Sequence, residues 1–213
     1  MVADATHALR ATRYRHGVGF SELLAHPEVR EELVLGSPVG FLALHGGLEP
    51  GTAEIAATAA SRSGASCYSV VQPDHLKQHV PSTEIDPRVS APLARFLGHV
   101  TTVVSLHGYW GHGPNPAVYV GGTGRDDAHR LAALLRDALP EYAIVDDLDS
   151  IPRRLRGTSA RNPVNAVPGG GVQLELPHPV RAVGPYGHGD HAARYHGERD
   201  ALIGALTAFA SAD

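Results

Sequence analysis

Cysteine, methionine and tryptophan each occur only once in this sequence of 213 residues. A single cysteine excludes an internal disulfide bond and a metal site built from several thiolates. Cys67 is followed by Tyr68-Ser-Val-Val71, so we expect it to be a small buried residue of a strand. The sequence also has no apolar run long enough to predict a transmembrane helix.

Signals for export are equally scarce. Arg10, Arg13 and Arg15 lie near the N-terminus, but no hydrophobic region of signal-peptide length follows them. We interpret residues 1–12 as a loose leader and expect a cytoplasmic protein.

The charge balance is slightly acidic, with a formal net charge of -4 and a pI of about 6.4. This argues against a general nucleic-acid or membrane-surface binder, which usually shows an excess of basic residues. The 18 basic residues are almost all arginine, a bias that a high-GC genome would also give. Because arginine binds carboxylates bidentately, a local cluster could still bind a polyanion. With 43% hydrophobic residues, this length predicts one α/β domain over residues 1–213.

The first informative stretch is a short apolar run at residues 39–44, bounded by Pro38 and Gly46, which predicts a buried strand. His45 stands at its carboxyl end, where open α/β sheets bind their ligands. Two glycines then allow a sharp turn that can bring Glu49 back beside His45. Thr52 is the expected N-cap of a helix over residues 53–61.

A second strand is expected to end in the same way. Residues 100–106 form a β-branched apolar run that is followed by His107 and Gly108. Parallel neighbouring strands would place His45 and His107 at one edge of the sheet. Catalytic zinc usually takes three protein ligands and keeps a position for water, so His45, Glu49 and His107 are candidate ligands.

A candidate catalytic carboxylate lies further along the chain. Three glycines at 169–171 precede an alternating strand that places Gln173 and Glu175 on one side. A carboxylate that faces a metal-bound water is the general base and acid that a hydrolytic zinc site needs. We therefore predict that Glu175 is catalytic.

Four motifs in this order resemble the phage-type poly-γ-glutamate hydrolase family. They are His45-Gly-Gly-Leu-Glu49-Pro-Gly-Thr-Ala-Glu54, Ser105-Leu-His107-Gly108, Val118-Tyr-Val-Gly-Gly122 and Gly171-Val-Gln-Leu-Glu-Leu176. The resemblance spans residues 14–181, and each motif gains weight from the presence of the others.

The resemblance implies a fold similar to zinc carboxypeptidases, a three-layer αβα domain with a central mixed sheet. It also implies zinc ligation by His45, Glu49 and His107, with Glu175 as the catalytic carboxylate. In the family, the first loop often has one more residue between the histidine and the glutamate, which leaves Glu54 as an alternative to Glu49. Glu54 is also explained without a metal, because a helix dipole favours glutamate in its first turn.

The resemblance and the composition of the loops suggest substrate contacts as well. Arg161 with Asn162 would hold a substrate carboxylate through charge-assisted hydrogen bonds, and Arg181 is a further candidate for substrate or oxyanion contact. Tyr109 or Trp110, directly after the second ligand strand, could form the floor of a substrate cleft. We interpret Arg153 and Arg154 as a solvated surface.

Several other residues suggest function less specifically. In the proline-containing loop 72–92, His75, His79, Asp86 and Arg88 could line a cleft, but surface exposure is the simpler expectation. His112 and the C-terminal His188, His191 and His196 are also interpreted as exposed, since their spacing is not typical of a metal site. The turn Gly121-Gly-Thr-Gly124 lacks the spacing of a nucleotide loop. Asp190 is the expected N-cap of a helix that ends near residue 210.

The residues thus predict a zinc-dependent hydrolase of amide bonds, and the resemblance implies the γ-glutamyl bonds of poly-γ-glutamate as its substrate. A phage enzyme released by lysis fits the lack of an export signal. The first alternative is a small-molecule amidohydrolase or peptidase that acts on acyl-amino acids or cell-wall peptides. The second is a non-catalytic metal-binding domain, against which the additional carboxylate Glu175 argues.

Overall fold

The computed structural model describes residues 17–110, 116–183 and 195–212. In these ranges the strands are β1 Arg30–Val34, β2 Ser37–Gly46, β3 Ala65–Val71, β4 Thr102–Gly108, β5 Ala117–Gly122, β6 Ala143–Val145 and β7 Val172–Leu176. The helices are α1 Phe20–Leu24, α2 Thr52–Ser63, α3 Ala91–His99, α4 Arg125–Ala138 and α5 His196–Ser211. The interpretations of residues 1–12, His112, His188, Asp190 and His191 lie outside the described residues.

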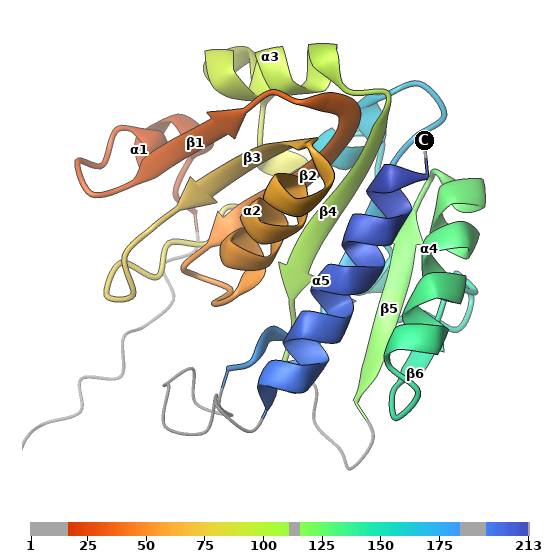
Figure 1. Cartoon of the computed structure of the whole chain (residues 1–213). Coiled ribbons are helices and arrows are strands. Elements are labelled where there is room, and N and C mark those ends of the chain that lie inside the picture. Colours follow the sequence, from red (N-terminus) through yellow and green to blue (C-terminus); the bar gives the residue numbers. More distant parts are fainter. Residues whose placement is uncertain (1–16, 111–115, 184–194, 213) are drawn as a thin grey trace, which may run out of the picture.

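All seven strands belong to one mixed sheet in the order β1-β3-β2-β4-β7-β5-β6 (Figure 1). The four central strands β3, β2, β4 and β7 are parallel to one another. β1 is antiparallel to β3, and β5 is antiparallel to β7. The carboxyl ends of the parallel strands therefore meet at one edge of the sheet.

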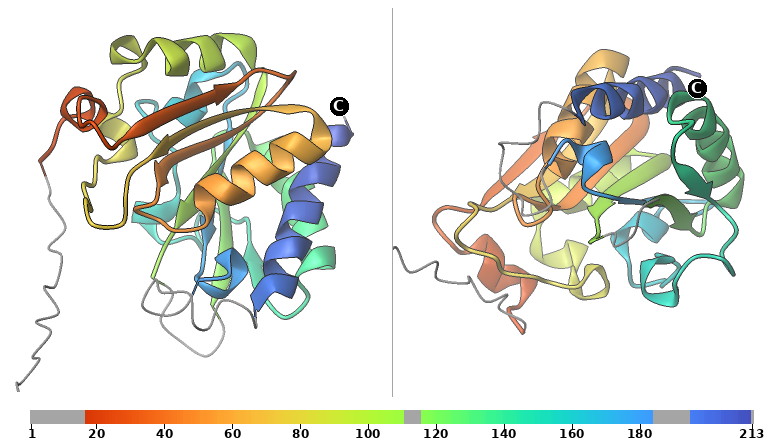
Figure 2. Two further views of the ribbon diagram at one scale, coloured as in Figure 1. Left: turned by 60° about the vertical axis from the view of Figure 1, so that its left-hand side comes forward. Right: turned by 90° about the horizontal axis from the view of Figure 1, so that it is seen from below.

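Helices cover both faces of the sheet, which confirms the expected three-layer α/β architecture. On one face, Phe41 and Ala43 of β2 share a core with α2, α4 and α5. On the other face, Leu42 and Leu44 pack with α1 and α3. Successive residues of a strand point to opposite faces, so β2 can be apolar throughout and serve two cores. Figures 1 and 2 show α2 and α5 side by side over the same face.

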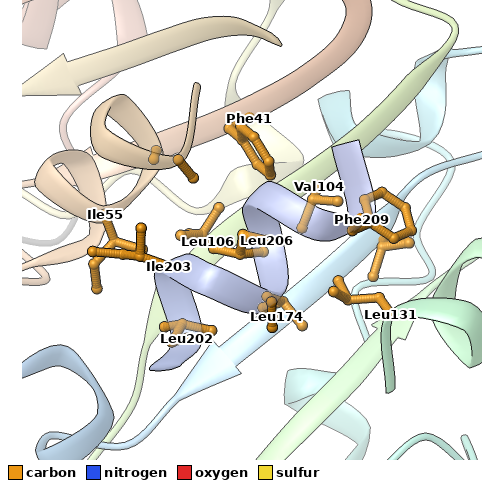
Figure 3. Close-up of a cluster of buried hydrophobic side chains, with 14 of the residues drawn as sticks. Phe41, Ile55, Val104, Leu106, Leu131, Leu174, Leu202, Ile203, Leu206 and Phe209 are labelled. Carbon is orange, nitrogen blue, oxygen red and sulfur yellow. The ribbon is translucent and has the colours of Figure 1, made fainter. Parts of the chain in front are cut away.

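Helix α5 closes the larger of the two cores. Leu206 and Phe209 on α5 pack over the sheet, where Val104, Leu106 and Leu174 supply the opposing side chains (Figure 3). All five side chains are fully buried. Burying a large aliphatic or aromatic side chain stabilises a fold by about 1.5–3 kcal/mol. This apolar layer holds β4 and β7 in place beneath the site.

The structure corrects two expected helix N-caps and adds one strand that was not expected. Thr52 is not the N-cap of α2: Gly51 holds that position with a left-handed φ of 91°, and the Thr52 hydroxyl donates to the Glu49 carbonyl instead. Strand β1 was not expected. The N-cap of helix α5, which begins at His196, is Tyr195 and not Asp190.

No helix in the described ranges is both long and apolar enough to cross a membrane.

Candidate metal centre and active site

The two predicted His-Gly pairs end neighbouring parallel strands. His45 precedes the last residue of β2, and His107 precedes the last residue of β4. Both side chains are buried, and their Nδ1 atoms lie 3.2 Å apart. Glycine follows each histidine because there is no space for a side chain. A Cβ at Gly46 would lie 2.6 Å from the Val70 carbonyl oxygen, and one at Gly108 would lie 2.5 Å from Cζ of Arg181.

Glu49 joins the two histidines from the loop after β2. Its backbone N–H donates to the His45 carbonyl at 2.8 Å, which turns the loop back toward the strand end. One carboxylate oxygen lies 3.0 Å from Nδ1 of His45, and the other lies 3.4 Å from Nδ1 of His107. The backbone N–H of Gly108 donates to Glu49 Oε2 at 2.9 Å. The carboxylate is thereby fixed between the two strand ends.

The outer nitrogens of both imidazoles have partners of their own. Nε2 of His45 lies 2.9 Å from the carbonyl oxygen of Val80, and Nε2 of His107 lies 2.9 Å from the Ser105 hydroxyl oxygen. A carbonyl oxygen only accepts, so Nε2 of His45 carries a proton. In the neutral imidazole the lone pair is then on Nδ1, which faces His107 and Glu49. Partners of this kind orient the histidines that bind metals.

This donor set fits a zinc ion. Ligand atoms from His45, Glu49 and His107 all lie within 4.8 Å of one another. Two imidazole nitrogens and one carboxylate oxygen form a typical set for catalytic zinc, which leaves a position for water. Glu54, the alternative to Glu49, is exposed in the first turn of α2 and does not join the cluster.

Electrostatics within the cluster favours the charged forms. Burial alone would raise the pKa of Glu49, but the charges of His45 and His107 and their hydrogen bonds hold it well below its usual value. Burial would likewise lower the pKa of His45, but the Glu49 carboxylate and the Val80 carbonyl together raise it. A partly buried carboxylate that stays ionised is ready to bind a cation.

Glu175 lies in β7, paired across the sheet with His107. Its side chain is buried, and Oε1 accepts a hydrogen bond of 2.8 Å from Nε2 of Gln173. Burial and the negative charge of Glu49 raise the pKa of Glu175 well above its usual value, against the opposing effect of Gln173. A carboxyl group of this kind can exchange protons near neutral pH.

Gln173 is itself held in place. Its Oε1 accepts a hydrogen bond of 2.7 Å from Nδ2 of Asn162, and Oδ1 of Asn162 accepts from the backbone N–H of Val164. The backbone of Gly157 packs on the Gln173 side chain, where a Cβ would lie 2.5 Å from Cδ. The chain of contacts from Asn162 through Gln173 fixes the position of the Glu175 carboxylate.

The candidate ligands and Glu175 line one cavity of about 550 Å³. Tyr109, Asn162 and Gln173 line it as well. So does His79, the one member of the four residues considered in loop 72–92 that lines this cavity. The His79 ring lies 5.1 Å from the His45 ring. The Tyr109 hydroxyl donates to the Ala117 carbonyl at 2.5 Å, so its hydrogen is already engaged.

The other predicted substrate contacts lie elsewhere. Arg161 is exposed and does not line the cavity. Arg181 is buried, and its guanidinium donates to the carbonyls of Leu176 and Pro50, so it ties two loops together. The indole of Trp110 is half exposed and contacts the ring of His178, 4.3 Å away. Arg153 and Arg154, interpreted as a solvated surface, are exposed but do line the cavity.

A mixed α/β sheet with two histidines and a carboxylate at its edge, close to the buried carboxylate of Glu175, is an arrangement typical of metal-dependent hydrolases. Comparison with known families narrows this class. The sequence profile described as poly-gamma-glutamate hydrolase matches residues 20–184, so the chain belongs to that family and is a hydrolase. A comparison with curated proteins gives no significant match.

Solved structures share the fold. A bacteriophage poly-gamma-glutamate hydrolase is 22% identical over 87% of this chain and 91% of that chain, with a TM-score of 0.67. YNDL in an apo, zinc-free form is 26% identical over 89% of this chain and 96% of that chain, with a TM-score of 0.66. A provisionally named carboxypeptidase A from Shewanella denitrificans OS-217 is 15% identical over 90% of this chain and 67% of that chain, with a TM-score of 0.50.

Proposed function

We propose that this protein is a zinc-dependent hydrolase that cleaves the γ-glutamyl amide bonds of poly-γ-glutamate. One observation carries the proposal: ligand atoms of His45, Glu49 and His107 converge in a cavity that Glu175 also lines. The family match and the similarity to a bacteriophage poly-gamma-glutamate hydrolase support the substrate. The description of YNDL as zinc-free supports the choice of metal.

The residues would divide the reaction as follows. Zinc held by His45, Glu49 and His107 would supply Lewis acidity to a water molecule and to the scissile carbonyl. Glu175 takes a proton from this water as the water oxygen attacks the carbonyl carbon. Its carboxyl group then donates the proton to the leaving nitrogen as the C–N bond breaks. Water is consumed, and an amine and a carboxylate are released.

The first experiment measures bound zinc and the release of amine from poly-γ-glutamate by the purified protein. We expect about one zinc per chain, because the cluster is one complete ligand set. Glu175→Gln should keep the metal and lose activity by about 10²-fold or more, because the general base is gone. His107→Ala should lose both zinc and activity.

Glu54→Gln is the matched control for the ligand assignment. Its exposed carboxylate lies on the same segment as Glu49, and its removal should leave zinc content and activity unchanged. Loss of zinc in Glu54→Gln but not in Glu49→Gln would overturn the ligand set. Retained turnover in Glu175→Gln would overturn the proton transfer. If the protein binds zinc and cleaves small acyl-amino acids but not the polymer, the proposed substrate is wrong and a small amide takes its place.

A further inference from the structure

Two chain segments that line the cavity differ in charge, and each is called a wall below. One wall is formed by residues 79–83 after β3, where Ser82 and Thr83 contribute neutral polar side chains. The other is formed by residues 153–159, which precede β7 and begin with Arg153 and Arg154. Among the described residues that line the cavity, the only carboxylates are Glu49 and Glu175. The second wall is therefore basic although the whole chain has a net charge of -4.

These two arginines differ from their neighbour Arg156. The Arg156 guanidinium donates to the Ile151 carbonyl at 3.0 Å and lies 3.8 Å from the Asp149 carboxylate. Within the described part of the chain, the guanidinium groups of Arg153 and Arg154 make neither a hydrogen bond nor an ion pair. Both side chains are exposed at the cavity, and the positive charge of Arg154 acts on Glu175. They can therefore bind an anion that enters the site.

We propose that Arg153 and Arg154 bind free carboxylates of the substrate chain and select a polyanionic substrate over a neutral one. The inference rests on the proposed function and deepens it. A glutamyl polymer linked through its side-chain carboxyl groups keeps a free α-carboxylate on every residue. The arginine fork matches a carboxylate in a bidentate geometry. The second wall carries two such forks in the cavity that Glu175 also lines.

The size of the effect follows from the exposure of the two side chains. Ion pairs in contact with solvent contribute about 0.2–1 kcal/mol each, which corresponds to a factor of up to about five in affinity. Loss of both arginines should therefore weaken substrate binding by about 10-fold at low salt. Added salt screens exposed charges, so the difference should shrink as the ionic strength rises.

The experiment compares the zinc-loaded protein with the double variant Arg153→Gln, Arg154→Gln. We expect KM for poly-γ-glutamate to rise about 10-fold at low salt with a smaller change in kcat, because proton transfer is assigned to Glu175 and the two arginines are assigned to binding. Short γ-glutamyl oligomers whose α-carboxylates are converted to carboxamides should be hydrolysed equally by both proteins. A fluorescently labelled γ-glutamyl oligomer should bind about 10-fold more weakly when the double change is added to Glu175→Gln.

The control is the double variant Arg62→Gln, Arg95→Gln, which removes the same charge from exposed positions on α2 and α3. Its KM and its salt dependence should equal those of the parent protein. If both double variants weaken binding equally, overall charge rather than the wall attracts the substrate, and the inference is wrong. Unchanged KM in the Arg153 and Arg154 double variant overturns it as well.

Failure of the proposed function gives a different result. In that case the parent protein binds zinc but releases no amine from either the carboxylate or the carboxamide oligomers. Failure of the arginine inference alone leaves hydrolysis intact and KM insensitive to the double change.

Discussion

Glu49 shows how closely the metal site is built into the backbone. Its carboxylate contacts both histidines and accepts the N–H of Gly108, while its own N–H donates to the His45 carbonyl. The site is therefore preorganised by the two strand ends. Such support keeps ligand geometry within the narrow tolerance that metal sites need.

Gln173 offers the sharpest prediction for a single residue. Gln173→Met keeps the length of the side chain but removes the hydrogen bond to Glu175 Oε1. That bond opposes the raised pKa of Glu175, so its loss should raise this pKa further. Since Glu175 must be ionised to accept a proton, the acid limb of the pH profile of kcat/KM should move to higher pH.

The pH profile separates positioning from a simple loss of stability. A variant that is only destabilised would lose active protein at every pH and keep the shape of its profile. Zinc content should equal that of the parent, because Gln173 does not contact the ligands. A profile whose acid limb stays in place, with unchanged KM, would contradict the role assigned to Gln173.

At the level of elements, the packing of α3 on the sheet depends on a residue without a side chain. A Cβ at Gly40 of β2 would lie 2.6 Å from Cζ of Phe96 on α3. Gly40→Ala should therefore displace the helix and destabilise the fold by about 1–3 kcal/mol. The midpoint of urea unfolding should fall accordingly.

Gly98 of α3 is the matched control, because a Cβ there meets no atom within 4 Å. Gly98→Ala should stabilise the protein by up to about 1 kcal/mol, since alanine is the better helix former. Equal unfolding midpoints for the two alanine variants would contradict this account of the packing.

Most elements were predictable because their signals are local. The apolar run before His45 and the β-branched run before His107 are strands, each followed by glycine where a side chain would collide with its surroundings. Strand β1 escaped prediction because an edge strand exposes alternate residues and carries charges. Its Glu31 accepts a hydrogen bond from the Tyr68 hydroxyl on β3, a contact that no local pattern reveals.

The part of the site that depends on short sequence separation was also predictable. Glu49 follows His45 by four residues, so one turn could bring them together. The sequence gives no reason to place Arg154 in the cavity or Arg161 outside it, because both lie in one basic, irregular segment. Their placement depends on the path that residues 153–161 take past the cavity. Such long-range arrangement needs the fold of the whole chain.

At the scale of the whole molecule, the charged cluster links stability to pH. The raised pKa of His45 stabilises the metal-free fold below the unfolded value of about 6.5, and this contribution is lost as the pH rises through the folded pKa. The lowered pKa of Glu49 stabilises the fold above about 4.3 and is lost as the pH falls through the folded pKa. Both contributions are present together between these values.

Bound zinc should stabilise the fold more at high pH than at low pH, which is opposite to the contribution of His45 in the metal-free protein. A protonated His45 cannot bind metal, so zinc affinity should fall as the pH drops through and below the raised pKa. At 100 times its dissociation constant, zinc should stabilise the fold by about 2.7 kcal/mol. The increase in Tm on addition of zinc should be larger at pH 8 than at pH 6. An equal increase at both pH values would mean that His45 does not bind the metal.

The hydrogen bond from His45 to the Val80 carbonyl has a consequence for how this protein can vary. Because the acceptor is a backbone oxygen, this hydrogen bond does not depend on which side chain stands at position 80. Its position depends instead on the path of the loop from Gln72 to Val80, which the Gln72 side chain closes by pairing with the backbone of Gln78. The ligand geometry should therefore withstand many substitutions in this loop but not the deletion of a single residue from it.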